Sequence, residues 1–163
     1  MQGANSTVVY HNNYITKTTI LDEDYDEPLE AATYRAAYLQ TLFSSYYQYI
    51  PKIYRVQNNV ITMERVTNSQ RLIDFLQTNI VSRSALINNV EVIITALSKA
   101  RILHRDVTYE NILVDSHHNL WLIDFGNSRR YQDTDDPQSM KEWDRSIFID
   151  TLDDISNIIK LLP

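Results

Sequence analysis

The stretch "LHRDVTYENILVDSHHNLWLIDFG", from Leu103 to Gly126, decides the fold. It holds a His-Arg-Asp group at His104–Asp106 and an Asp-Phe-Gly group at Asp124–Gly126. The runs "NILVD" and "LWLIDF" between them have the length and composition of two short strands, joined by an exposed polar turn at 116–119. The pattern therefore predicts one small strand pair with an acidic motif on each side.

Three side chains of this stretch have the chemistry of phosphoryl transfer. That reaction needs an acceptor hydroxyl held in line, divalent metal on the phosphates and a cation on the phosphates that are not transferred. Asp106 would accept or orient the proton of the attacking hydroxyl. Asn111 and Asp124 offer the oxygen ligands that magnesium prefers. We therefore predict a catalytic carboxylate and two metal ligands at one edge of a cleft.

The spacing of these motifs resembles the catalytic loop and the metal loop of eukaryotic-type protein kinases. The helical pattern "VEVIITALSKARIL" directly before the catalytic loop is also where that family has it. The resemblance implies an α+β, two-lobe protein kinase-like fold that uses ATP and magnesium. A small N-lobe (hairpin, helix, two strands, hinge) would span residues 1–66, and a reduced, mostly helical C-lobe would span residues 67–163.

The resemblance also implies a nucleotide site. Lys17, in the predicted hairpin "STVVYHNNYITK", would be the lysine that grips the phosphates and completes the catalytic set. The strand "NNVITMERV" would end in the hinge. The residues implied around the adenine are Val9 above it, Met63 at the back, Glu64 to Val66 along the hinge, and Leu113 below it.

The glycine content departs from the family pattern. The chain has only two glycines, Gly3 and Gly126, so a glycine-rich phosphate loop is impossible. Any grip on phosphate must come from side chains, a metal or other backbone amides. The small atypical kinases of the KEOPS tRNA-modification complex are similar in their "QGA…VVY" opening, and they carry threonine where this chain has Thr108.

The helix predicted over residues 29–48 is a second departure. Its alignment to the family puts Arg35 where a glutamate should pair with the lysine, and Glu30 is the nearest acid. Either this helix is rotated or shifted, or the pair between Lys17 and a glutamate is absent. A cation beside Lys17 would weaken the site, so this departure favours an inactive member. The apolar stripe that would be buried in this helix is Leu29, Ala32, Ala36, Leu39 and Phe43.

After Gly126 only 37 residues remain (163 − 126 = 37). We expect "SRRYQDTDDPQSMKEWDRS" to be a short acidic replacement for the activation segment, and "DTLDDISNIIKLLP" to be a short helix. The resemblance implies that Asp154, with Asp153 as the rival, holds the catalytic loop from below. The fold would thus be truncated after the first large-lobe helices, a form that occurs among bacterial effectors and viral proteins.

Composition excludes several classes of protein. The formal charge is −6, which argues against direct nucleic-acid binding. Cysteine is absent, no run approaches 18 apolar residues, and the N-terminus lacks a signal pattern, so we expect a soluble intracellular protein without a membrane span. The acids of "LDEDYDEPLE" are predicted to form a solvated loop, because a calcium loop would need a glycine for its turn.

Three functions fit this sequence. The first is a minimal protein kinase that moves the ATP γ-phosphate to a protein serine or threonine hydroxyl. The alternative is a pseudokinase-type module that occupies a host or cellular partner protein, with nucleotide structural or absent. A small-molecule phosphotransferase is the third. A homodimer is possible in each case, because surface left by missing helices would need a cover.

Overall fold

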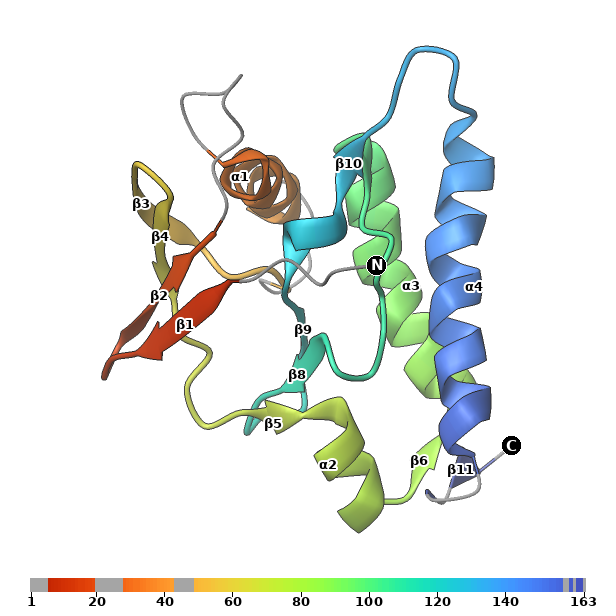
Figure 1. Cartoon of the computed structure of the whole chain (residues 1–163). Helices are drawn as coiled ribbons and strands as arrows, with labels where there is room; N and C mark the ends of the chain where they lie inside the picture. Colours follow the sequence, from red (N-terminus) through yellow and green to blue (C-terminus); the bar gives the residue numbers. More distant parts are fainter. Residues whose placement is uncertain (1–5, 20–27, 43–48, 157–158, 160, 163) are drawn as a thin grey trace.

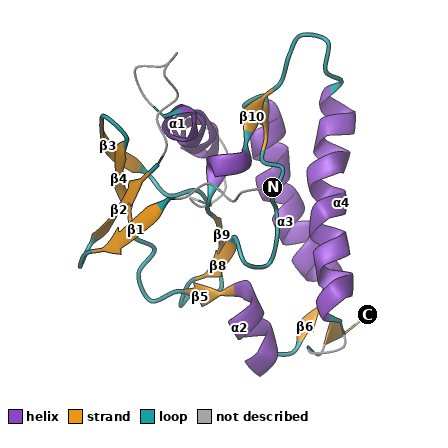
Figure 2. Ribbon diagram, in the orientation of Figure 1, coloured by secondary structure: helices purple, strands orange, loops and turns teal. Residues whose placement is uncertain are grey.

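The computed structural model describes residues 6–19, 28–42, 49–156, 159 and 161–162. It confirms the α+β class. Strands β1 to β4 gather with α1 on one side of the molecule, and the long helices α3 and α4 lie side by side on the other (Figures 1 and 2). The lobe boundary expected at residue 66 falls between β4 and β5 and stays a prediction.

A four-stranded antiparallel sheet, ordered β1-β2-β4-β3, carries the lysine of the site. The predicted hairpin around 11–13 is confirmed. The two further strands predicted for this lobe pair as β3 and β4 and turn at Asn58, which adopts the left-handed backbone that asparagine tolerates (φ 51°). Lys17 is paired with Val8 on one side and Ile61 on the other, so its backbone is fixed in an inner strand. The strands are β1 Thr7–Tyr10, β2 Tyr14–Thr18, β3 Ile53–Gln57 and β4 Val60–Glu64.

Helix α1, Leu29–Leu42, is rotated relative to the predicted stripe. Leu29 is 42% exposed and Leu39 is 53% exposed, and Phe43 lies outside the described residues. The buried face is made by Glu30, Ala31, Thr33, Tyr34 and Ala37 instead. Small side chains on this face let α1 approach the metal loop and α3 closely. The rotation turns Glu30 inward and Arg35 outward.

The remaining elements surround the catalytic stretch. The strand pair predicted there is confirmed, and β5 joins it in the order β5-β8-β9. The bounds are β5 Gln70–Arg71, α2 Leu72–Thr78, β6 Val81–Ser82, α3 Arg83–Lys99, β7 Ile102–Leu103, β8 Ile112–Val114, β9 Leu120–Leu122, the 3₁₀ turn η1 Phe125–Asn127, β10 Arg129–Arg130, α4 Pro137–Ile155 and β11 Leu161–Leu162.

One expectation for this half is wrong. The region after β10 is not only a loop before a short helix. α4 begins at Pro137, where the Asp136 side chain accepts from the Ser139 N–H and caps the helix.

One continuous apolar core joins these elements. Its fully buried members include Leu97 of α3, Ile112 of β8, Leu122 of β9 and Leu152 of α4. The core thus lies beneath the catalytic stretch and fixes the strands that flank it. Among the described residues, no helix combines the length and apolar character that crossing a bilayer requires.

Candidate active site

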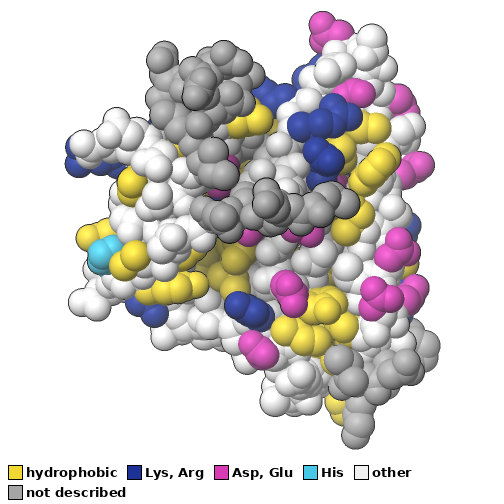
Figure 3. All heavy atoms as spheres, in the orientation of Figure 1, with side chains coloured by type: hydrophobic (Ala, Val, Ile, Leu, Met, Phe, Trp, Pro, Cys, Tyr) yellow, Lys and Arg dark blue, Asp and Glu magenta, His cyan; other side chains and the backbone are white. Residues whose placement is uncertain are grey.

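A cleft of about 600 Å³ lies between the four-stranded sheet and the β5-β8-β9 strands. Figure 3 shows hydrophobic side chains in its hollow and charged side chains around its mouth. The residues predicted for the site that line the cleft are Lys17, Met63, Glu64, Val66, Asn111, Leu113 and Asp124. Side chains from opposite ends of the sequence therefore meet around one cavity.

Val9 is not among the residues that line the cleft. Successive residues of a strand face opposite sides, and on β1 the lining positions are Val8 and Tyr10. Val9 is 49% exposed. The prediction of Val9 is wrong by one residue. β1 is an exposed edge strand with apolar residues on both faces, so its sequence has no alternation of apolar and polar residues that would show which face lines the cleft.

Lys17 lies between two carboxylates. Its Nζ is 2.6 Å from Glu30 Oε1 and 2.7 Å from Asp124 Oδ1. Burial alone would lower the pKa of Lys17, but the two carboxylates outweigh burial and raise it. Glu30 is therefore the partner of Lys17, and the alternative that Arg35 occupies this place is wrong. This contact removes the main sequence argument for an inactive site.

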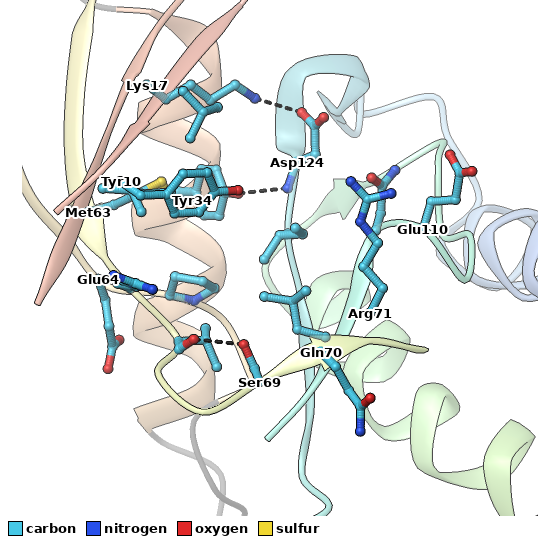
Figure 4. Close-up of a pocket in the computed structure, with 18 of the residues that line it drawn as sticks. Tyr10, Lys17, Tyr34, Met63, Glu64, Ser69, Gln70, Arg71, Glu110 and Asp124 are labelled. Carbon is cyan, nitrogen blue, oxygen red and sulfur yellow. Dashed lines mark hydrogen bonds and ion pairs between the residues drawn. The ribbon is translucent and has the colours of Figure 1, made fainter. Parts of the chain in front are cut away.

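Asp124 is held in an unusual backbone conformation. Its φ of 63° and ψ of 74° lie in the left-handed region, which a non-glycine residue rarely adopts. The Tyr34 hydroxyl accepts a hydrogen bond from the Asp124 N–H at 2.7 Å (Figure 4). Burial raises the pKa of the Asp124 carboxyl, but the hydrogen bond and charge of Lys17 prevail and lower it. The carboxylate is thus ionised and directed toward the cleft.

The catalytic loop brings Asp106 and Asn111 together. The Asn111 side-chain N–H group donates to the Asp106 carbonyl at 3.0 Å and to Asp106 Oδ2 at 2.9 Å. Asn127, just after the Asp-Phe-Gly group, makes a longer contact of 3.4 Å with the same carboxylate oxygen. Asp106 is not among the residues that line the cleft, whereas Asn111 is. The Asn127 contact links Asp106 to the metal loop.

The loop is anchored by Asp144 on α4, and this corrects the prediction of Asp154 or Asp153. The Asp144 carboxylate accepts from the backbone N–H of His104 at 2.9 Å and of Arg105 at 2.8 Å. Asp153 pairs with Arg83 and Asp154 is exposed. The error has a simple cause: α4 begins earlier than predicted, so the aspartate that reaches the loop lies earlier in the sequence.

His104 is fully buried beneath the metal loop. Its Nε2 lies 3.2 Å from the Ile123 carbonyl oxygen, and its ring meets the Phe125 ring edge-on at 4.6 Å. Burial lowers the pKa of His104 to about 4, whereas burial raises the pKa of Asp144 to about 6. His104 is therefore a neutral packing residue at pH 7, not a catalytic base.

The side chains of Asn111 and Asp124 fit a magnesium ion whose other ligands would come from outside the protein. Asn111 uses its N–H group for Asp106, which leaves its carbonyl branch for a metal, and Lys17 contacts only Oδ1 of Asp124. Magnesium is commonly held by one or two protein oxygens plus phosphate. Among the described residues, no cluster of three or more His, Asp or Glu side chains forms a self-contained metal site.

Arg71 adds a positive charge to the cleft. It lies on β5, paired with Leu113 of β8, and its side chain extends into the cleft in Figure 4. Its guanidinium makes no hydrogen bond or ion pair with a residue that the structure describes. Its charge is therefore available to an anionic ligand.

This geometry is that of a kinase cleft, and comparison with known proteins agrees. Residues 10–156 match the ABC1 atypical kinase-like domain. The chain belongs to this family. The match runs from Tyr10, the last residue of β1, through α4, so it includes most of the residues that line the cleft, the catalytic loop and the Asp144 anchor.

A curated relative points to the same chemistry. The ABC1 domain is 34% identical over 62 residues to a 3-deoxy-D-manno-octulosonic acid kinase of Vibrio vulnificus (strain CMCP6). The match covers 38% of this chain and 26% of the relative, so the chain spans about a quarter of that protein. Family and relative together support phosphotransferase chemistry in general.

Four residues of the site were not predicted from the sequence: Tyr34, Arg71, Asn127 and Asp144. Tyr34 and Asp144 act on backbone groups distant in sequence, and no local pattern indicates such a contact. A signal existed only for Asn127, because an amide directly after Asp-Phe-Gly lies beside the metal loop.

Proposed function

We propose that this ABC1 domain transfers the γ-phosphoryl group of ATP to a hydroxyl group, with magnesium. The observation that carries the proposal is the position of Lys17, buried between Glu30 and Asp124 at the wall of a 600 Å³ cleft. A lysine arranged in this way can neutralise phosphate oxygens. Its two carboxylate partners hold the ammonium group in position, and its raised pKa keeps it protonated.

The other residues divide the remaining work. Met63 and Leu113 offer apolar contacts to a base, and Glu64 to Val66 offer backbone groups along the hinge. Asn111 and Asp124 would hold magnesium, which supplies neutralisation of the phosphates. Asp106, oriented by Asn111, would accept the proton of the attacking hydroxyl.

As acceptor we propose a serine or threonine hydroxyl of a protein, as the His-Arg-Asp and Asp-Phe-Gly motifs favour. A sugar-acid hydroxyl is the second candidate. It is supported by the name of the relative and by Arg71, whose charge complements a carboxylate.

The test is phosphoryl transfer from γ-labelled ATP by the purified protein. Acceptors would be a set of serine- and threonine-containing proteins, 3-deoxy-D-manno-octulosonic acid and a neutral hexose. We expect magnesium-dependent product from wild type and a loss of at least about 100-fold in Asp106→Asn, since general-base catalysis contributes roughly 10²–10⁴-fold. Equal product from wild type and Asp106→Asn would exclude catalysis at this site.

Nucleotide binding distinguishes the enzyme from the pseudokinase-type module. A ligand at 100 times its Kd stabilises the folded state by about 2.7 kcal/mol, which a thermal-shift titration detects. A midpoint unmoved by millimolar Mg-ATP would favour a nucleotide-free partner-binding module. Stabilisation without transfer would favour a module in which nucleotide is structural.

A further inference from the structure

Tyr34 reaches the metal loop from α1, on the same face as Glu30. Its side chain is buried, with 2% of the residue exposed, yet it lies at the wall of the cleft. Its ring packs against Phe125 with centroids 4.3 Å apart, and its hydroxyl accepts the hydrogen bond from the Asp124 N–H (Figure 4). One side chain therefore contacts both the ring and the backbone of the Asp-Phe-Gly group.

The backbone of Asp124 needs such a contact. A left-handed conformation is less favourable for a residue other than glycine, and it persists where the surroundings hold the backbone in place. The N–H of Asp124 points into the protein, toward α1. If it lost its acceptor there, a buried donor would be left without a hydrogen bond, which is unfavourable. Without the Tyr34 hydroxyl, the conformation that directs the Asp124 carboxylate to the cleft loses its backbone hydrogen bond.

The carboxylate has its own restraints, but they act on the other end of the residue. Lys17 contacts Oδ1 at 2.7 Å, and the Gly126 N–H donates to the same oxygen at 3.4 Å. These contacts fix where the oxygen lies only if the backbone is already in place. The hydroxyl of Tyr34 and the ammonium of Lys17 thus hold different parts of Asp124.

We infer that Tyr34 is a positioning residue for the metal site, whose hydroxyl holds Asp124 in the conformation that lets its carboxylate bind magnesium. The part of the inference that concerns magnesium rests on the proposed function. The part that concerns the Asp124 backbone does not, because the hydrogen bond to Tyr34 is present without ligands. Burial raises the pKa of Tyr34 well above 10, so the hydroxyl stays neutral across the working pH range.

The test compares Tyr34→Phe with Tyr131→Phe. Both changes remove only a hydroxyl from a buried tyrosine, and Tyr131 does not line the cleft. In metal-free protein, amide hydrogen exchange by NMR should be faster at Asp124 in Tyr34→Phe and unchanged there in Tyr131→Phe. In the presence of ADP, Mn²⁺ titration by electron paramagnetic resonance should show metal affinity about 10–100-fold weaker in Tyr34→Phe, the usual effect of losing a group that orients a metal ligand.

Two results would overturn the inference. One is exchange at Asp124 and metal affinity both equal to wild type. The other is faster exchange throughout the core in Tyr34→Phe, which would mean a general loss of stability. If wild type binds neither ADP nor metal, the proposed function fails, and the exchange rate at Asp124 alone decides whether Tyr34 restrains the loop.

Discussion

At the scale of single residues, Glu30 holds the Lys17 ammonium group at the wall of the cleft. Burial raises the pKa of Glu30 more than Lys17 lowers it, so the carboxylate is costly to keep charged. The cost is offset because the ammonium of Lys17 is 2.6 Å away. The two charges therefore depend on each other. If either is removed, the other stays buried without its nearest opposite charge.

We predict that Glu30→Gln lowers phosphoryl transfer at least tenfold. The amide keeps the shape of the side chain but loses the charge that fixes Lys17, which would then be held by Asp124 alone. Steady-state rates at saturating Mg-ATP would measure the effect. Arg35→Gln is the matched control on the exposed face of α1 and should stay within about twofold of wild type. An equal loss in both variants would contradict the rotation of α1.

At the scale of elements, α4 determines the geometry of the catalytic loop. The Asp144 carboxylate is 1% exposed and takes two backbone N–H groups of that loop. The Arg105 backbone between His104 and Asp106 is left-handed, with φ of 70°. The loop thus depends on a helix that begins only after β10.

We predict that Asp144→Ala lowers the free energy of unfolding by about 2–5 kcal/mol, because it leaves two loop N–H groups without their acceptor. Asp154→Ala, on the exposed side of the same helix, should change it by less than about 0.5 kcal/mol. Urea unfolding of both variants provides the measurement. A larger loss in Asp154→Ala would restore the assignment made from the sequence.

The elements also show what the sequence could and could not predict. The hairpins and the β8-β9 pair were predictable because β-rich runs are separated by asparagine or polar turns. α1 was misoriented because "LEAATYRAAYLQTL" carries apolar residues on every side, so no stripe identifies the buried face. Lys17, Asn111 and Asp124 lie in motifs with fixed spacing. Tyr34 and Asp144 were missed because only the packed fold brings them to the loop.

At the scale of the whole molecule, two buried groups give opposite responses to pH. The folded-state pKa of His104 is about 4, below the unfolded value of about 6.5. Its contribution to stability is therefore complete above pH 6.5 and is lost as pH falls toward 4. The folded-state pKa of Asp144 is about 6, above its unfolded value, so the folded protein binds more protons than the unfolded chain between pH 4 and 6. Its contribution to stability rises as pH falls through that range.

We predict that replacing either group leaves the pH dependence of the other group unopposed. Relative to wild type, His104→Phe should gain stability as pH falls from 6.5 to 4, and Asp144→Asn should lose stability over the same range. Each change should be on the order of 3 kcal/mol. Chemical denaturation at intervals across this range would measure both. Difference curves of the same sign would show that the two groups do not oppose each other.

The anchor on α4 has a consequence for the order of events during synthesis. The loop around Asp106 comes before Asp144 in the sequence, so it leaves the ribosome first. Its two N–H groups have no Asp144 acceptor until α4 has been made, and a domain generally folds as a unit. We therefore expect the catalytic loop to take its final geometry only once α4, the last helix that the structure describes, has left the ribosome.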